Sequence, residues 1–290
     1  MFLGSIVAIV TPFKNGAVDE EALGKMIENH IVSGTGGVVP CGTTGESATL
    51  THEEHKRVIE MTVKMVDGRI PVIAGTGSNS TEEAVALTLH AKSAGADGAL
   101  LITPYYNKPP QEGLFQHYKK IAESVDLPLV LYNIPGRTGV NMLPETVKRL
   151  MTYDNIVAVK EGSGSIQQVA ELIHLCRDRL NVLSGDDAIT LPMMSLGAKG
   201  AISVTANVVP EDMAKMIAAA AREDLSTARS WHHRLYPLHS ALFLETNPIP
   251  VKVALSLLGQ CSEEVRLPLS PLSDANRTRL KTAMTDYGLL

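Results

Sequence analysis

The stretch Leu127-Pro128-Leu129-Val130-Leu131-Tyr132-Asn133-Ile134-Pro135 begins with a short apolar run and ends in polar residues and proline. The stretch Ile156-Val157-Ala158-Val159-Lys160-Glu161-Gly162 has the same layout. Short apolar runs without polar alternation are typical of strands that are buried on both faces of a parallel sheet. Six further runs share this character: residues 6–10, 37–40, 71–74, 99–102, 182–183 and 201–204. The sequence therefore predicts eight buried strands.

Segments of helical period separate these runs. Apolar residues recur at i, i+3, i+4 and i+7 from Ile166 to Ile173 and again from Met213 to Ala220. Thr51 and Ser80 each precede acidic residues, which predicts helix starts, whereas glycines at 34, 95 and 197 predict helix ends. Alternating strands and helices favour a parallel sheet, and eight such units favour a closed (β/α)8 TIM barrel. An open, doubly wound sheet is the alternative.

The predicted barrel covers residues 1–224. Residues 225–290 have the pattern of further helices, around Trp231, over 248–258 and over 274–287. No low-complexity linker separates the two parts. We therefore expect a C-terminal helical extension that packs on the barrel as one structural unit.

Composition limits the class of protein. The chain has 290 residues and a net charge of -5, so it offers no basic stripe for nucleic acid. Its three cysteines are scattered, which argues against a disulfide framework and fits a reducing compartment. No apolar run approaches the roughly 20 residues of a membrane span, and the N-terminus lacks the pattern of a signal peptide. A cytoplasmic protein with no nucleic-acid or membrane partner is expected.

Polar residues follow the predicted strands, and in a barrel these carboxyl ends meet at one rim, where catalytic residues lie. The rim residues are hydroxyl side chains, glycine amides and a single lysine, with no metal-ligand set. His52 and His55 are expected on an exposed helix start without a third ligand. Asp186 and Asp187 are more readily explained as helix-capping acids than as a cation site. No metal is predicted.

Lys160 ends an apolar run, so its amine should emerge at the barrel mouth with apolar neighbours behind it. Burial lowers the pKa of a lysine, and the free amine can then attack a carbonyl and form a Schiff base. Tyrosine and threonine hydroxyls on other strand ends could relay the protons. The alternative is a lysine that extends its charge into solvent.

The turn Gly42-Thr43-Thr44-Gly45-Glu46 is rich in glycine but matches neither a P-loop nor a dinucleotide fingerprint. Its amides and hydroxyls could hold a small carboxylate. An ordinary turn without a ligand is the alternative at this point.

Four motifs, in this order along the chain, carry a resemblance to a known family: Gly42 to Ser47, Tyr132 to Gly139, Lys160-Glu161, and Asn247-Pro248-Ile249-Pro250. They resemble the dihydrodipicolinate synthase family, within the N-acetylneuraminate lyase superfamily, and the likeness covers essentially the whole chain. Two positions depart from the family pattern, namely Cys41 and the stretch Gly162-Ser163-Gly164. Neither departure removes a predicted catalytic group.

The resemblance implies a lyase that condenses pyruvate with L-aspartate 4-semialdehyde to 4-hydroxy-tetrahydrodipicolinate, the first committed step of the diaminopimelate pathway to lysine. It implies that pyruvate forms an imine on Lys160 and that no metal or organic cofactor is needed. It also implies that Tyr132 is the general acid/base, with Thr44 and Tyr106 completing a hydroxyl relay. The implied substrate-binding residues are Thr43 and Thr44 for the pyruvate carboxylate, Arg137 for the carboxylate of the semialdehyde, and Gly185 and Ile202 beside the imine.

Two further properties follow from the resemblance. Tyr106 is expected to reach into the site of a neighbouring subunit, within a homotetramer built from two tight dimers. L-lysine is expected to inhibit by binding at the tight-dimer interface, at Ser47, Ala48, His52, His55, Asn79, Glu83 and Tyr105. The alternative for this set is an ordinary polar helix start and interface rim.

Two other functions remain as alternatives. A sister lyase would release pyruvate from N-acetylneuraminate or a keto-deoxy sugar acid through the same lysine imine. Arg137 argues against it, because the corresponding stretch of such lyases lacks the Gly-Arg pair. A non-catalytic barrel would bind a small acid or serve as a scaffold, but it would not need the predicted lysine, tyrosines and threonine together.

Overall fold

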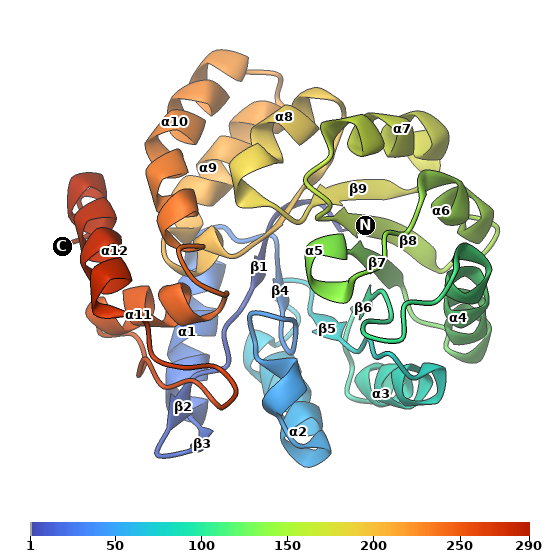
Figure 1. Cartoon of the computed structure of the whole chain (residues 1–290), viewed down its shortest axis with the longest axis horizontal. Coiled ribbons are helices and arrows are strands. Elements are labelled where there is room, and N and C mark those ends of the chain that lie inside the picture. Colours follow the sequence, from blue (N-terminus) through green and yellow to red (C-terminus); the bar gives the residue numbers. More distant parts are fainter. Residues whose placement is uncertain (1) are drawn as a thin grey trace.

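The computed structural model describes residues 2–290, and Figure 1 shows a ring of strands surrounded by helices. The eight strands of the main sheet are all parallel to their neighbours. They are β1 (Gly4–Ala8), β4 (Gly37–Val39), β5 (Ile73–Gly75), β6 (Gly98–Ile102), β7 (Leu129–Asn133), β8 (Ile156–Glu161), β9 (Asn181–Ser184) and β10 (Gly200–Ser203). Each of them overlaps one predicted run, although β1 begins and ends two residues earlier than expected.

The sheet closes on itself. Its order is β4-β1-β10-β9-β8-β7-β6-β5, and an isolated parallel bridge between Val38 and Val72 joins the two ends. The amide of Val38 donates to the carbonyl of Pro71 at 2.9 Å across this seam. The TIM-barrel prediction is therefore confirmed, and the open doubly wound alternative is wrong.

The helices that follow the strands begin and end where the sequence predicts. Thr51 caps α2 with a reciprocal capping box, and the Ser80 side chain accepts from the amide of Glu83 at the start of α3. Glycines 34, 95 and 197 have positive φ just after α1, α3 and α8. The helices of this part are α1 (Glu20–Val32), α2 (His52–Val66), α3 (Thr81–Ser93), α4 (Gln111–Ser124), α5 (Pro135–Thr138), α6 (Pro144–Leu150), α7 (Ile166–Cys176), α8 (Thr190–Ser195) and α9 (Pro210–Ala221), with short 3-10 helices η1 (Ser47–Thr49), η2 (Arg177–Arg179), η3 (Asp187–Ile189) and η4 (Thr205–Asn207).

Three more helices follow α9, and Figure 1 shows them at one side of the barrel, beside α1 and α9. They are α10 (Leu225–Ala241), α11 (Ile249–Leu257) and α12 (Asp274–Tyr287). Buried residues of these helices, such as Leu238, Val251 and Leu280, belong to the same apolar core as Val7 of β1 and Leu23 of α1. The segment that links α10 to α12 therefore reaches back to the barrel, which matters for the site described below.

The interior of the barrel is filled by one side chain or more from each strand, and these side chains form a separate apolar cluster from those under the helices. Tyr132 belongs to this interior cluster, and in the β7–β8 register it lies opposite Lys160. A small antiparallel hairpin, β2 (Phe13–Lys14) and β3 (Ala17–Val18), was not predicted, because two-residue strands are too short to have a recognisable period. None of the helices within residues 2–290 is long and apolar enough to cross a membrane.

Candidate active site

Lys160 lies near the carboxyl end of β8 and is only 5% exposed. Burial lowers the pKa of its amine from the ordinary value of 10.5 to about 8. The negative charge of Asp187 opposes this shift, whereas the positive charge of Arg137 adds to it. At pH 7 about a tenth of such an amine is neutral, against well under a thousandth for an ordinary lysine. The site therefore supplies a nucleophilic amine near neutral pH.

Tyr132 lies on the adjacent strand β7, with the Lys160 Nζ 4.2 Å from the centroid of its ring. Its side chain is 5% exposed. Burial raises the pKa of the Tyr132 phenol above its usual value, and hydrogen bonding to Thr43 together with the charge of Arg137 partly offsets that effect. The phenol therefore stays protonated at neutral pH and can donate a proton beside the amine.

Gly185 and Ile202 complete the surroundings of the lysine. A Cβ atom at Gly185 would lie 3.2 Å from the Lys160 Cε, so a larger residue there would crowd the lysine side chain. Ile202 of β10 is buried in the barrel interior in the same cluster as Tyr132. Gly185 thus lies against the lysine side chain, and Ile202 lies in the interior of the same barrel.

The loop Gly42–Glu46 follows β4, and its amides fall into two groups. The amides of Gly45, Glu46 and Ser47 donate to carbonyls within the loop at 3.1 to 3.4 Å. Among residues 2–290, the amides of Thr43 and Thr44 donate to no backbone carbonyl of the chain. Thr44 is buried, and its hydroxyl accepts from the Asn247 side-chain amide at 3.0 Å. Two unused amides beside a hydroxyl suit a small carboxylate.

Arg137 and Tyr106 lie nearer the surface. Arg137 is on the short helix α5, is exposed, and donates from Nη2 to the backbone carbonyl of Asn247 at 3.1 Å. Tyr106 is 89% exposed and has a φ of 72°, in the left-handed region. Both residues border a second hollow of the surface. Tyr106 does not line the main cavity of its own chain within residues 2–290.

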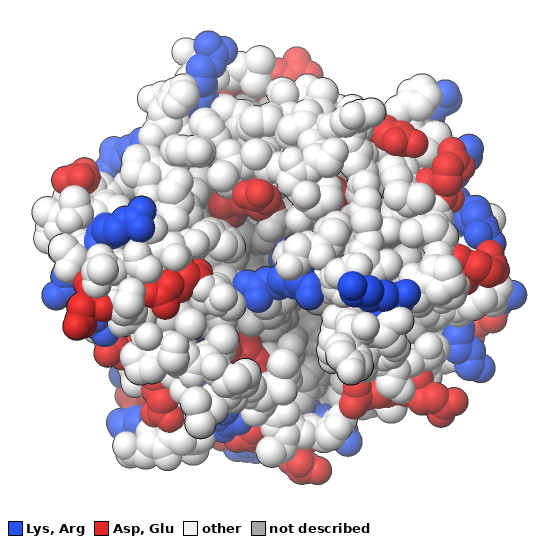
Figure 2. Space-filling view, in the orientation of Figure 1, with Lys and Arg blue, Asp and Glu red and all other residues white. Residues whose placement is uncertain are grey.

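The main cavity is the more enclosed of the two hollows and has a volume of about 440 Å³. Thr43, Tyr132 and Arg137 line it, and so does Asn247, which is hydrogen-bonded to both Thr44 and Arg137. Figure 2 shows the molecule hollowed near the centre of this face, with charged side chains at the edge of the hollow. The size suits small metabolites rather than polymers.

Residues expected to bind L-lysine line the same cavity. These are Ser47, Ala48, His52, His55, Glu83 and Tyr105, whereas Asn79 does not line the cavity but contacts Tyr105. Glu83 accepts from the Ser78 hydroxyl and lies 3.3 Å from the His52 Nε2. The Asn79 side-chain amide donates to the Tyr105 carbonyl at 3.2 Å. Six of the seven predicted residues therefore line one cavity, together with Thr43 and Arg137.

The expectation for His55 was wrong. It is 7% exposed instead of lying on an exposed helix start, because α2 turns this side chain toward the cavity wall. Burial lowers its pKa to about 4, so the imidazole is neutral at physiological pH.

Of the two acids after β9, Asp186 caps η3, and Asp187 accepts from the amides of Val204 and Thr205 at 3.0 and 2.8 Å. Within residues 2–290 no three His, Cys, Asp or Glu side chains are grouped for a metal ion.

Two supports of the site were missed in the sequence. Glu161, next to Lys160, is buried and accepts from the Asn133 amide, the Gln168 amide and the Ser163 backbone, at 2.6 to 3.3 Å. This network joins the ends of β7 and β8. Asn247 joins Thr44 to Arg137 from a position 203 residues beyond Thr44. The Asn247-Pro248 motif was visible, but no spacing rule could connect it to the loop after β4.

Comparison with known proteins shows the family of the chain. The profile of the dihydrodipicolinate synthetase family matches residues 1–287. The 4-hydroxy-tetrahydrodipicolinate synthase of Geotalea uraniireducens is 61% identical over 290 residues, which is all of both chains. The chain belongs to the dihydrodipicolinate synthetase family. It is accordingly an enzyme of the lyase class.

Two solved structures of the family extend the comparison. The chloride-inhibited dihydrodipicolinate synthase of Acinetobacter baumannii, complexed with pyruvate, is 49% identical, with a TM-score of 0.98 over 100% of both chains. The dihydrodipicolinate synthase of Cyanidioschyzon merolae with lysine bound is 42% identical, with a TM-score of 0.95 over 99% of both chains. These relatives bind the two small molecules that the sequence analysis expects for this family.

Proposed function

We propose that this chain condenses pyruvate with L-aspartate 4-semialdehyde to 4-hydroxy-tetrahydrodipicolinate, through an imine on Lys160. The observation that carries the proposal is the buried amine, whose pKa is lowered to about 8 and whose Nζ lies 4.2 Å from the Tyr132 ring centroid. Family membership and the names of relatives that are about 60% identical support the choice of substrates.

In the first half of the reaction the neutral amine of Lys160 attacks the keto carbon of pyruvate. The resulting carbinolamine loses its hydroxyl as water, and Tyr132 is positioned to supply the proton. The carboxylate of pyruvate lies against the Thr43 and Thr44 amides, which leaves the methyl group free to return a proton to the Tyr132 oxygen. The product of this half is an enamine still attached to the lysine.

In the second half the enamine carbon attacks the aldehyde carbon of the semialdehyde. Arg137 binds the carboxylate of that substrate, because a guanidinium can hold it with two hydrogen bonds. The amino group of the same substrate then attacks the imine carbon and displaces the Lys160 amine as the ring closes. The covalent bonds form between the two substrates and the Lys160 amine, and hydroxyls of the chain move the protons, so the proposal includes no metal or organic cofactor.

A turnover assay tests the proposal. The purified protein is given pyruvate with L-aspartate 4-semialdehyde and, in parallel, N-acetylneuraminate alone. Condensation at a rate well above cleavage is the expected result. Cleavage of the sugar acid without condensation would instead assign the chain to the sister lyases. The absence of both activities would contradict both assignments.

Two finer properties belong to the same proposal. The exposed Tyr106 reaches the site of a second copy of the chain, so that the working enzyme is a dimer or a dimer of dimers. L-lysine binds in the part of the cavity lined by Glu83 and His52, with its α-ammonium on Glu83 and its carboxylate near Asn79 and the Tyr105 hydroxyl. A lysine-bound relative with 42% identity supports this second property.

A further inference from the structure

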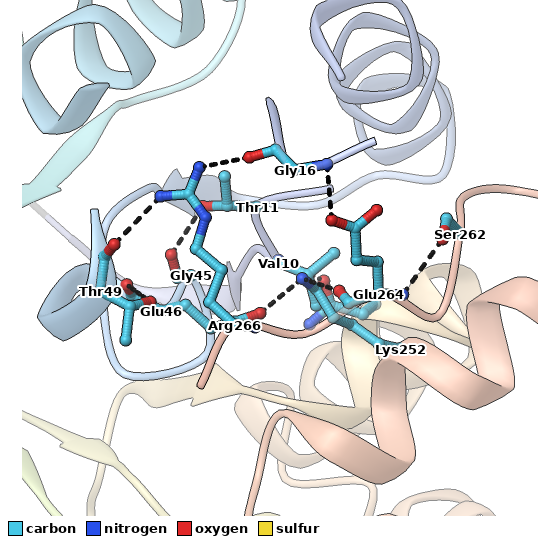
Figure 3. A network of polar contacts seen from close by, with 11 residues as sticks. Val10, Thr11, Gly16, Gly45, Glu46, Thr49, Lys252, Ser262, Glu264 and Arg266 are labelled. Carbon is cyan, nitrogen blue, oxygen red and sulfur yellow. Dashed lines mark hydrogen bonds and ion pairs between the residues drawn. The ribbon is translucent and has the colours of Figure 1, made fainter. Parts of the chain in front are cut away.

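A fully buried ion pair connects the loop after β4 to the C-terminal part of the chain. Lys252 of α11 donates from Nζ to Glu46 Oε1, and the two side chains are 0% and 1% exposed. Figure 3 shows the pair among polar contacts that join the loop to residues 252–266. Burying two charges is expensive, and apolar residues of similar size would often give equal or greater stability. Stability alone therefore does not explain why this ion pair is present.

The pair is fully supplied with partners. The second oxygen of Glu46 accepts from the backbone amide of Arg266 at 3.0 Å. Lys252 also donates to the Glu264 carbonyl at 2.8 Å and lies 4.0 Å from the centroid of the Phe13 ring. Each charge is thus held in one geometry by more than one contact, which is what a buried polar network needs to define a single conformation.

The Arg266 side chain strengthens the same anchor. Its guanidinium makes two 2.6 Å hydrogen bonds to Glu54 at the start of α2 and one of 3.0 Å to the Thr49 carbonyl of η1. It also donates to the Gly16 carbonyl at 2.8 Å. The chain at Glu46 and directly after it is therefore fixed to the segment around residue 266.

Glu46 is the last residue of the loop that offers the Thr43 and Thr44 amides. Its φ of 53° and ψ of 38° lie in the left-handed region, which costs a non-glycine residue free energy and needs support from its surroundings. The residue before Glu46 is held too, because the Thr11 hydroxyl donates to the Gly45 carbonyl at 2.7 Å. The position of the two free amides thus depends on an unfavourable backbone conformation that Lys252 and Arg266 stabilise.

We propose that Glu46, held by Lys252 and Arg266, is a positioning residue that sets the Thr43 and Thr44 amides for the carboxylate of pyruvate. This inference rests on the proposed function. Glu46 does not touch the reacting atoms, and it acts through the loop that it ends. Its effect should therefore fall on pyruvate and leave the semialdehyde, which is assigned to Arg137, nearly unaffected.

The test uses the full chain with Glu46→Gln and with the charge-neutral double change Glu46→Gln/Lys252→Met. Two quantities are measured, the pyruvate concentration for half-maximal imine trapping by borohydride and the two KM values in turnover. We expect half-saturation and KM for pyruvate to rise at least about tenfold in both variants, since small misplacements of binding groups have effects of this size. The KM for the semialdehyde should change less than about threefold, because changes at one site usually have little effect at a separate site.

The double variant separates positioning from stability. Removing both charges leaves no uncompensated buried ion, so it should recover melting temperature relative to Glu46→Gln yet keep the raised pyruvate KM. It also serves alone if Glu46→Gln does not fold. Leu280→Ala in α12, where the side chain is fully buried, is the matched control, since it should lower the melting temperature without changing either KM.

Three results would overturn the inference. They are an unchanged pyruvate KM in the double variant, equal changes in both KM values, or a Leu280→Ala control with the same pyruvate defect. A wild-type chain that forms no imine at any pyruvate concentration would overturn the proposed function as well. A normal wild-type imine with an unaffected double variant would overturn only the positioning role.

Discussion

The two tyrosines assigned to the site are held in opposite ways. Tyr132 lies in the barrel interior, 5% exposed, in register with Lys160 on the next strand. Tyr106 lies in the loop after β6, 89% exposed, with a left-handed backbone. The first is fixed by the core of its own chain, whereas the second is not buried by any residue among 2–290.

This difference indicates which part of the site one chain can build alone. Strand ends of a closed barrel have little freedom, so the amine, the phenol beside it and Gly185 are already in place. A large aromatic side chain left in solvent is a common feature of surfaces that meet another protein. We therefore expect changes at the strand ends to prevent imine formation. Changes at the exposed residues should affect the steps after the imine has formed.

The largest effect is expected for Lys160→Ala. Without the amine no imine can form, so kcat should fall by at least about a thousandfold, as for other enzymes that lose a nucleophile. Circular dichroism should still report a folded barrel. A variant that keeps more than a tenth of wild-type turnover would place the nucleophile elsewhere.

Arg137→Ala should have the next largest effect, and only on the second substrate. Losing the contacts to a charged carboxylate should lower kcat/KM for the semialdehyde by roughly two orders of magnitude or more. Pyruvate labelling of Lys160 should remain. Arg137→Lys keeps the charge, so its kcat/KM for the semialdehyde should lie between those of the wild type and Arg137→Ala. Equal loss of pyruvate labelling would contradict the assigned role.

Tyr106→Phe tests the role of the exposed tyrosine. If the residue serves the neighbouring site, mixing this variant with Lys160→Ala should produce heterodimers in which one of two sites is complete. Activity should then exceed that of either variant alone. A mixture of Lys160→Ala with Arg137→Ala is the control, because both residues belong to one chain's site and no complete site can form. Complementation in the control, or its absence in the test despite subunit exchange, would contradict the assignment.

The lowered pKa of Lys160 predicts a pH dependence of imine formation. The amine reacts when it is deprotonated, so the initial rate with pyruvate should rise about tenfold per pH unit below 8 and level off above it. Samples aged at each pH and quenched into borohydride at one fixed pH measure this rate. A rate that continues to rise up to pH 10 would show that the lysine has an ordinary pKa.

The smallest effect is expected for L-lysine in the polar part of the cavity. Partial inhibition at sub-millimolar to millimolar concentration is in line with ordinary metabolite affinities. Glu83→Ala should weaken it, since the substitution removes the carboxylate proposed for the α-ammonium. No inhibition at about 10 mM lysine, or identical inhibition in the variant, would exclude this site.

Short-range patterns predicted the barrel well. The eight apolar runs, the caps at Thr51 and Ser80 and the placement of Lys160 at a strand end follow from local chemistry and from the rule that strand ends converge. The sequence could not place Asn247 or Lys252 beside residues about 200 positions earlier, because tertiary packing alone joins them. His55 was misplaced for a related reason, since a helix start can face a cavity rather than solvent.

The proposed reaction depends on an imine between Lys160 and pyruvate. The most direct measurement is peptide mass spectrometry after incubation with pyruvate and borohydride. We expect one pyruvate-derived addition per chain, on the peptide that contains Lys160, and none in Lys160→Ala. An unmodified Lys160 peptide, or full labelling of Lys160→Ala, would contradict it.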